Sequence, residues 1–421
     1  MTCRSGLGII VGSTVLVCSR GWGQIPLITG PGPVRIFNTD MAVLEAQDVR
    51  KDLPCTVTPG KATLGFDLRF HTGYDVTVPL KELAGSENQL TILFRVTPQE
   101  KDKPKDPNAQ ASYFVQHFHV PALEEDAKGD ATLSGNVDLG EGNYHIDWLM
   151  RDRAERVCSF YWDTEAALPA KDKQIEVALQ KNQVERTISE QFIEEPPVAR
   201  KPSDHPLNIK VLVNFAPQDK DAATFQPFDT LALVSILRRI SREPEFGKFS
   251  VVAFNIQEQR VLYRQNSADR IDFPALGDAI NTVKLGRVDF KKLGQKHPDT
   301  EFLTDLIRRE MGTDDHPDAL VFAGPKVMLE EGVPQDTLKP LADVDYPVFY
   351  MNFALNPQQT PWKDSISRAV HVFKGTEYTI SRPRDLWFAV TEMVSRIVKS
   401  KHGRAPVAGA LSGSGAAINQ P

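Results

Sequence analysis

One run in the second half of the chain, Ile209–Pro217, most constrains the fold. It reads Ile-Lys-Val-Leu-Val-Asn-Phe-Ala-Pro, whose β-branched and apolar residues predict a buried strand. Helical spacing follows over Phe228–Ile240, and strand-like and helical runs then alternate as far as a closing helix at Pro383–Val398. This alternation predicts an α/β domain over residues 207–400, built on a doubly wound, mostly parallel sheet. Within it, Val370–Phe373 is expected to be a last short strand.

The first half has a different pattern, with short alternating runs separated by turn residues and almost no helical period. These runs lie within residues 53–180 and predict an N-terminal antiparallel β-sandwich. The flanking segments are expected to be irregular. We predict an extended lead-in over 25–52, a proline-containing linker over 181–206 and a disordered tail, rich in Gly, Ala and Ser, over 401–421.

The N-terminus has the layout of a secretory signal peptide. Arg4 precedes the apolar run Gly6–Val17, and small residues follow near Gly23, which predicts a signal peptide over residues 1–24. A buried first strand and a membrane anchor are the alternatives, but the run is too short to span a bilayer. No other apolar run reaches the length of a spanning helix. We therefore expect an exported mature chain, periplasmic or secreted, without a transmembrane segment.

Export bears on the four cysteines. Cys3 and Cys18 would leave with the signal peptide, so that Cys55 and Cys158 remain. In an oxidising compartment a single remaining pair predicts a disulfide, and two buried free thiols are the alternative. The formal net charge of −6 is mild for this length and argues against a nucleic-acid partner.

The order of elements across 207–400 resembles a von Willebrand factor A-like (VWFA-related) domain. The matching features are the opening strand, an amphipathic helix, a short strand pair near Phe249–Arg264 and a buried strand that ends at Gly324. The whole chain also resembles exported VWFA-related bacterial proteins in which a β-rich region precedes such a domain. The resemblance implies an envelope-associated protein that binds other proteins.

The family's metal-ion-dependent adhesion site is missing from the sequence. That site uses an Asp-x-Ser-x-Ser run after the first strand, but this chain has Asn214-Phe215-Ala216-Pro217-Gln218. The later strand is followed by Lys326 where the family has an aspartate. Mg²⁺ requires oxygen ligands, so we predict no metal here and no cofactor.

Ligands of open α/β sheets bind beyond the carboxyl ends of the strands. If this domain binds a protein partner, the residues expected to contact it are Asn214, Gln218, Asp219, Lys326 and Asn352. Their amides and charges would hydrogen-bond to a protein loop without coordinating a metal.

His117 and His119 are two apart on a predicted strand and therefore share a face. They could begin a zinc site if His71 or His145 supplied another ligand. The alternative, which we favour, is a solvated face of the sheet.

These patterns together predict an exported, non-catalytic binding or scaffolding protein with one or more protein partners. Two alternatives from other classes stay open. The first is an exported hydrolase whose site assembles only in three dimensions, and the second is a structural component of an envelope assembly.

Overall fold

In the computed structural model the chain forms two compact units. Their boundary falls between Ser189 and Glu190. The residues described are 25–27, 36–99, 111–188, 190–202, 206–219, 222, 224–283, 285, 296–312, 316–356, 358 and 363–402. The signal peptide predicted over 1–24, and almost all of the tail predicted over 401–421, lie outside this set.

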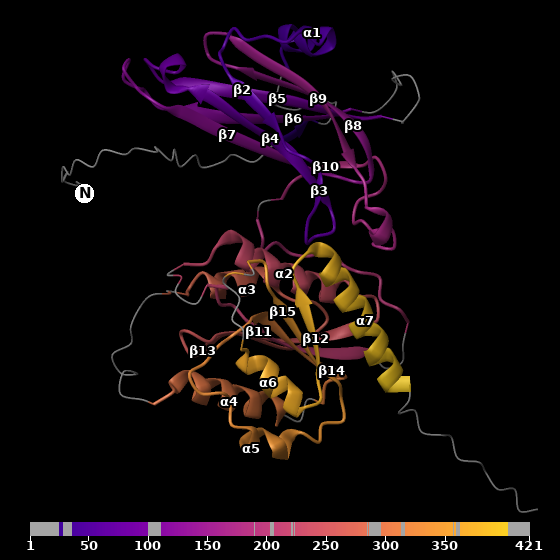
Figure 1. The fold of residues 1–421 in the computed structure, drawn as a ribbon. Helices are drawn as coiled ribbons and strands as arrows, with labels where there is room; N and C mark the ends of the chain where they lie inside the picture. Colours follow the sequence, from indigo (N-terminus) through magenta and orange to yellow (C-terminus); the bar gives the residue numbers. More distant parts are fainter. Residues whose placement is uncertain are drawn as a thin grey trace, which may run out of the picture. The chain divides into compact units, whose positions relative to one another are not determined.

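Two antiparallel sheets form the first unit, in a sandwich-like arrangement (Figure 1). One sheet has the order β1-β6-β5-β8-β9 and the other β10-β7-β4-β2, with β3 also paired to β4. The strands are β1 (Ile25–Leu27), β2 (Thr56–Pro59), β3 (Thr63–Leu64), β4 (Phe70–Pro79), β5 (Asn88–Gln99), β6 (Ser112–Val120), β7 (Asp130–Leu139), β8 (Gly142–Arg151), β9 (Val157–Ala166) and β10 (Val184–Arg186). The antiparallel β-rich half expected from the sequence is present.

Large aromatic side chains form the core of this unit. The Tyr74 ring, from β4, lies 5.3 Å from the Trp148 ring of β8 and 5.7 Å from the Phe94 ring of β5. All three side chains are buried. Since they come from both sheets, their packing holds the two sheets together.

The lead-in predicted over 25–52 is not simply extended, because it contains helix α1 (Asn38–Ala46). Leu44 of this helix is fully buried and packs with Leu93, Val115 and Leu149 on the first sheet. These apolar side chains would otherwise be exposed to water, so their burial stabilises a helix at this position. Arg151 of β8 also pairs with Asp40 of the helix.

The linker predicted over 181–206 also begins with regular structure. Its strand β10 pairs with β7, and Val184 lies opposite Leu139. The side of β7 that faces away from β4 supplies the backbone groups with which the short, polar strand β10 pairs. The sequence of residues 181–206 does not by itself indicate this pairing.

A disulfide joins Cys55 to Cys158, as predicted. Cys55 directly precedes β2 of one sheet, and Cys158 lies in β9 of the other. The bridge therefore links the two sheets as well as two segments that are 103 residues apart in sequence.

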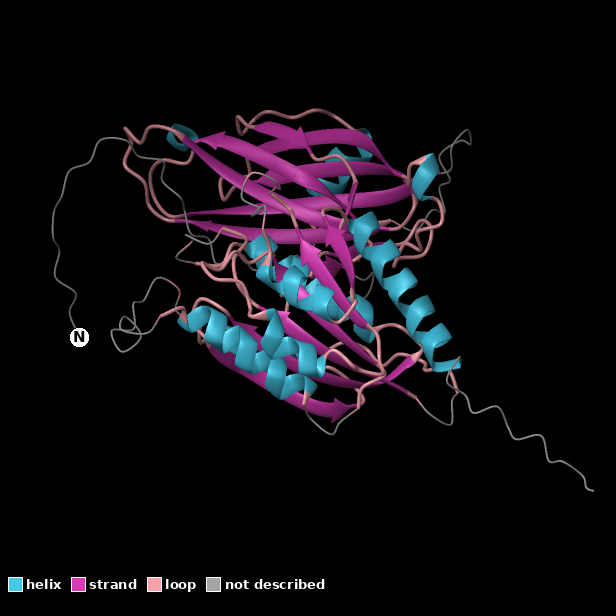
Figure 2. Cartoon of the chain, turned by 60° about the horizontal axis from the view of Figure 1, so that its bottom comes forward, coloured by secondary structure: helices cyan, strands magenta, loops and turns pink. Residues whose placement is uncertain are grey.

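A six-stranded sheet with the order β13-β12-β11-β14-β15-β16 forms the centre of the second unit (Figures 1 and 2). β11 pairs in parallel with both β12 and β14, and β15 pairs in parallel with β14 and β16. Only β13, at one edge, runs antiparallel to its neighbour. The strands are β11 (Leu207–Asn214), β12 (Phe246–Asn255), β13 (Arg260–Ala268), β14 (Ala319–Pro325), β15 (Val348–Phe353) and β16 (Thr376–Ile380).

Helices cover this sheet, and Figure 1 shows α4, α5 and α6 on one side with α2, α3 and α7 on the other. Apolar residues of α4 and α6 pack with Leu212, Phe322 and Tyr350 of the sheet in one buried cluster. None of the helices in the described part of the chain is long and apolar enough to cross a membrane. The helices are α2 (Pro227–Ser241), α3 (Phe273–Ile280), α4 (Pro298–Met311), α5 (Gln335–Leu338), α6 (Ser365–Val372) and α7 (Pro383–His402).

The strand predicted at Val370–Phe373 is wrong, because these residues end helix α6 and the last strand is β16. The helix begins where the Asp364 carboxylate accepts a hydrogen bond from the Ile366 amide. This N-cap fixes the helix start and outweighs the modest strand preference of the β-branched residues that follow.

The disulfide generates a stability prediction. Replacing both cysteines, Cys55→Ser with Cys158→Ser, should lower the free energy of unfolding of the first unit by about 4–5 kcal/mol, because the bridge closes a long loop. Urea titration with hydrogen exchange resolved along the sequence measures each unit separately. Reductant should reproduce the loss in the native chain and leave the double variant unchanged. An equal loss of unfolding free energy in the second unit would show that the disulfide does not act on the first unit alone.

Candidate functional site

Three central strands of the second unit end together at the carboxyl edge of the sheet. Val213 of β11 lies opposite Ala323 of β14, and Gly324 lies opposite Asn352 of β15. Since the parallel register is continuous, Asn214, Gly324 and Asn352 form one row, and both amide side chains share a face. A Cβ at Gly324 would lie 2.9 Å from the Cβ of Asn214, so only glycine fits between them without displacement.

The two asparagines of this row are fully buried. Asn214 Oδ1 accepts a hydrogen bond from the Ile256 amide at 3.2 Å, and Asn352 Nδ2 donates to Glu377 Oε1 at 2.7 Å. These partners fix the orientation of each amide. Among the described residues, Asn214 Nδ2 and Asn352 Oδ1 have no hydrogen-bond partner. The row thus keeps one donor and one acceptor at the end of the sheet.

Gln218 joins the loops that follow β11 and β15. Its Oε1 accepts hydrogen bonds from the Leu355 amide at 2.8 Å and the Asn356 amide at 3.2 Å, and its Nε2 donates to Asn356 O at 2.5 Å. Its own amide donates to Asp229 Oδ1, at the start of α2. Gln218 is buried and fixes two loops that border the edge.

This burial changes the expected roles of the predicted contact residues. Asn214, Gln218 and Asn352 are 0%, 3% and 0% exposed, so a partner that docks on the surface cannot reach their amides. These three side chains form the buried interior of the carboxyl edge. Asp219 and Lys326 are partly exposed and are the two predicted residues that remain accessible.

Lys326 directly follows β14 at the rim of the edge. It makes no hydrogen bond or ion pair with any residue in the described part of the chain. Two residues later, Met328 is 42% exposed. The rim therefore presents a cation next to an apolar side chain.

Asp364 was not predicted, although its place before α6 matches the pattern of a helix N-cap. Its Oδ1 accepts hydrogen bonds from the amides of Val327 and Ile366, at 3.2 and 3.0 Å. The neighbouring Tyr350 hydroxyl donates to Pro325 O at 3.2 Å. Burial raises the pKa of Asp364 to about 6, against the lowering effect of the amide hydrogen bonds. The loop after β14 is thus tied to a carboxyl group that titrates near neutral pH.

A histidine in the first unit lies between two carboxylates. His71 Nδ1 lies 2.8 Å from Asp138 Oδ1, and His71 Nε2 lies 2.9 Å from Asp67 Oδ1. Burial alone would lower the pKa of His71, but the hydrogen bonds with Asp138 and Asp67 outweigh it and raise the pKa to about 10. The ring is therefore an imidazolium between two carboxylates at neutral pH.

The ligand atoms of Asp67, His71 and Asp138 lie within 4.8 Å of one another, a spacing that could hold a metal ion. Two observations favour an ion-pair network instead. Arg69 already contacts Asp138 at 3.3 Å and Glu185 at 2.9 Å, so a cation would be repelled. Both ring nitrogens also face carboxylates, so neither offers a free lone pair. Since Thr187 donates to Asp138, the network fixes the chain where it leaves the sandwich.

His117 and His119 are both exposed on β6, as expected for a solvated face. The ring of His117 contacts Thr91 Oγ1 at 3.1 Å. The two other candidate ligands have different partners, since His71 lies in the network above and His145 contacts Asp163 and Asp147. The described residues do not bring the four histidines together.

No family model and no curated protein sequence matches the chain. The solved structures that it is similar to include the PilB minor pilin from Streptococcus sanguinis, at 9% identity and a TM-score of 0.28 over 74% of this chain and 89% of that one. Beta-glucuronidase 2 from Bacteroides uniformis matches at 8% identity and a TM-score of 0.18, over 83% of this chain and 32% of that one. The structural genomics target SoR45 matches at 11% identity and a TM-score of 0.17, over 32% of this chain and 99% of that one. Likenesses this weak carry no argument about fold or function.

The raised pKa of Asp364 predicts a pH dependence. Because the folded state binds this proton more tightly than the unfolded chain, stability falls as pH rises from about 4 through about 6. Asp364→Asn keeps the oxygen that caps α6 and removes the buried charge. It should stabilise the second unit by up to about 3 kcal/mol at pH 8 and change it little at pH 4.

Urea unfolding of the full chain, with hydrogen exchange at β15 and α6, measures this difference. Asp278→Asn, at an exposed position on α3, is the matched control and should show no such pH dependence. A constant effect of Asp364→Asn from pH 4 to 8 would contradict the raised pKa.

The His71 network predicts a second titration. Because the folded pKa is raised, the network's contribution to stability is complete below about pH 6.5 and is lost as pH rises through about 10. The NMR ring resonances of His71 should therefore not titrate between pH 5 and 8. Asp138→Asn should bring the midpoint down into that range. If the His71 ring of the wild-type protein titrates with a midpoint near pH 6.5, the two carboxylates do not stabilise its protonated form.

Proposed function

We propose that this protein is an exported, non-catalytic binding or scaffolding protein, and that its second unit is a von Willebrand factor A-like recognition domain without a metal site. Support comes from the strand order β13-β12-β11-β14-β15-β16, with four parallel pairings and one antiparallel edge strand. The family resemblance of the sequence rests on the same element order. The disulfide is consistent with an oxidising compartment.

The observation that carries the proposal is the chemistry of the carboxyl edge. The position where the related domains begin their metal-binding run contains the buried amide of Asn214, and the buried amide of Asn352 lies in the same row beyond Gly324. Lys326 adds a positive charge at the rim. An edge of this kind favours recognition by hydrogen bonds and charge over coordination of a metal.

The partner contact is therefore assigned to the rim and not to the buried row. Lys326 and Asp219 would meet the partner, while Asn214, Gln218 and Asn352 hold the surrounding backbone in place. A charged residue at a rim contributes mainly to the rate and specificity of association. The expected partner surface carries carboxylates opposite Lys326.

Charge reversal tests this assignment. Lys326→Glu should reduce capture of the native partner at least about tenfold and leave the unfolding free energy within about 0.5 kcal/mol. Capture after crosslinking in the native envelope, with quantitative mass spectrometry, identifies proteins whose yield depends on this residue.

Lys339→Glu is the matched control. Lys339 is exposed, lies in a 3₁₀ turn between α5 and β15, and pairs with Asp336. Its reversal should leave capture unchanged. If both variants capture the same proteins in the same yield as the native chain, the carboxyl-edge rim is not the binding surface.

A further inference from the structure

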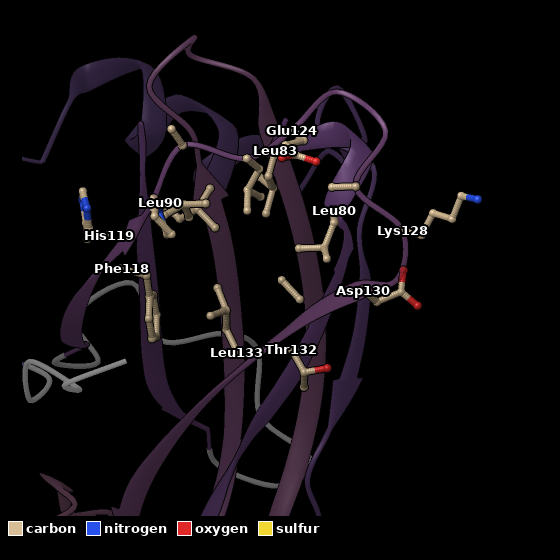
Figure 3. Close-up of a pocket in the computed structure, with 16 residues that line it drawn as sticks. Leu80, Leu83, Leu90, Phe118, His119, Glu124, Lys128, Asp130, Thr132 and Leu133 are labelled. Carbon is tan, nitrogen blue, oxygen red and sulfur yellow. The ribbon is translucent and has the colours of Figure 1, made fainter. Parts of the chain in front are cut away.

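The first unit contains an apolar cavity of about 620 Å³ (Figure 3). Its lining includes Leu83, Leu90 and Phe118, which are all less than 10% exposed. The register of β1 with β6 places residues 20–24, which lie outside the described part of the chain, opposite residues 116–120 beside this cavity. The described residues do not show what covers the cavity, and no ligand is assigned to it.

In the second unit, the loop after β14 presents its outer residues by alternation. We call residues 326–331 the rim loop. Val327 is 8% exposed and belongs to a buried apolar cluster, against which Leu329 also packs. Lys326 and Met328, on either side of Val327, are partly exposed and exposed. The residues that a partner could reach are therefore positioned by the inner contacts of their neighbours.

Hydrogen bonds tie the inner side of the rim loop to the start of α6. The Val327 amide donates to Asp364 Oδ1 at 3.2 Å, and the Ser365 amide donates to Val327 O at 2.7 Å. The Leu329 amide donates to Ser365 Oγ at 3.3 Å. Asp364 Oδ1 also accepts the hydrogen bond that caps α6. One carboxyl group thus holds both the rim loop and the helix.

This carboxyl group is buried without a cation beside it. Asp364 is 8% exposed and makes no ion pair with any residue that the structure describes. The side chains that face it are the Tyr350 hydroxyl of β15 and the Glu377 carboxylate of β16, which adds a second negative charge. Because burial and a like charge both favour the neutral form, the structure around Asp364 is most stable when the carboxyl group is protonated.

The nearest cations in the sequence do not change this conclusion. Lys326 precedes Val327, Lys363 precedes Asp364, and Arg368 lies one turn along α6. All three side chains are at least partly exposed. None of the three forms an ion pair with Asp364 in the described structure, so loss of the proton leaves a buried charge uncompensated.

The far end of the rim loop has a contact that protonation also favours. His297 Nε2 lies 3.3 Å from a carboxylate oxygen of Glu331, and His297 Nδ1 lies 3.6 Å from one of Glu330. The Thr300 hydroxyl donates to Glu331 O at 2.7 Å. An imidazole is charged, and forms an ion pair with a carboxylate, only when it is protonated. The other charged side chains next to His297 in the sequence are Lys296, Asp299 and Glu301.

We propose that protonation of Asp364 controls the rim loop, so that acid holds the loop in the described conformation and loss of the proton releases it. A partner that contacts Lys326 on the held loop then binds more tightly at acidic pH than at neutral pH. Binding and protonation favour the same conformation and therefore strengthen each other. This regulation of binding rests on the proposed function of the rim, whereas the movement of the loop does not.

Hydrogen exchange in the full chain measures the opening of the rim loop. After correction for intrinsic exchange rates, the opening equilibrium at the Val327 and Leu329 amides should rise about tenfold between pH 5 and 7.5, because Asp364 ionises more readily once the loop is open. In Asp364→Asn this equilibrium should not change with pH. If the Val327 amide exchanges only as slowly as those of Val211–Val213 in β11, the loop opens only with the whole unit and the proposal is wrong.

Two further variants identify the group that is responsible. The tenfold change at Val327 should persist in His297→Gln and in Asp278→Asn, an exposed acid on α3. Loss of the change in His297→Gln would assign the effect to His297 and overturn the role of Asp364. The pH series of the native chain does not depend on the folding of any variant, and a flat series would also overturn the proposal.

Capture at two pH values tests the regulation of binding. Photo-crosslinking in the native envelope identifies proteins whose yield is lowered by Lys326→Glu. Their yield with the native chain should be at least about threefold higher at pH 5.5 than at pH 7.5, and this ratio should be lost in Asp364→Asn. An unchanged ratio in Asp364→Asn would overturn the regulation and leave the proposed function standing. If no captured protein depends on Lys326, the proposed function fails and the regulation of binding fails with it, whatever hydrogen exchange shows.

Discussion

The second unit depends on a charge buried inside its sheet. Lys210 lies on the central strand β11 and is only 3% exposed. Its ammonium donates to Glu310 O at 2.8 Å and lies 3.1 Å from Glu310 Oε2, at the end of α4. Burial would raise the pKa of Glu310, but the hydrogen bond from Arg264 and the charge of Lys210 outweigh it and lower the pKa. Removal of Glu310 would take the carboxylate away from a buried ammonium, which is costly, so this contact fixes α4 against β11.

The opposite end of strand β11 is also buried, but it carries an uncharged side chain. Asn214 is also fully buried, but its side chain is neutral and accepts a hydrogen bond from the backbone amide of Ile256. The charged anchor lies near the start of β11 and the amide row lies at its end. The carboxyl edge therefore rests on buried side chains with fixed partners, whereas Lys326 and the loop after β14 at its rim are partly exposed.

Much of this architecture could be predicted from the sequence because each half has its own periodicity. Alternation located the long strands of the first unit, and strand–helix alternation located β11, β12, β14 and β15. The failures occurred where tertiary contacts outweigh local pattern. Helix α1 depends on the apolar outer face of a sheet formed much later in the chain. Helix α6 depends on one side-chain cap, although its last residues resemble a strand.

The candidate site was harder to predict than the fold, for a related reason. Position along a strand locates Asn214 and Asn352 at the correct edge, but it does not say whether the loops close over them. The closure depends on Gln218, whose side chain joins residues more than a hundred positions away. The His71 network is hard to predict for the same reason, since Asp67, Asp138 and Thr187 come together only after three distant segments pair.

The two units also differ in the chemical groups at the edges of their sheets. In the second unit, the parallel strands have their backbone groups paired and the accessible polar groups at the rim belong to side chains such as Lys326. In the described part of the first unit, β1 and β10 each pair with three residues of β6 and β7, and an apolar cavity is lined by residues of the same two strands. Side-chain charge at a rim can be reversed by one substitution, whereas backbone pairing is insensitive to the partner's exact sequence but requires an extended conformation and alternating apolar residues. The recognition proposed for the rim therefore depends on side-chain charge, which a single substitution such as Lys326→Glu reverses.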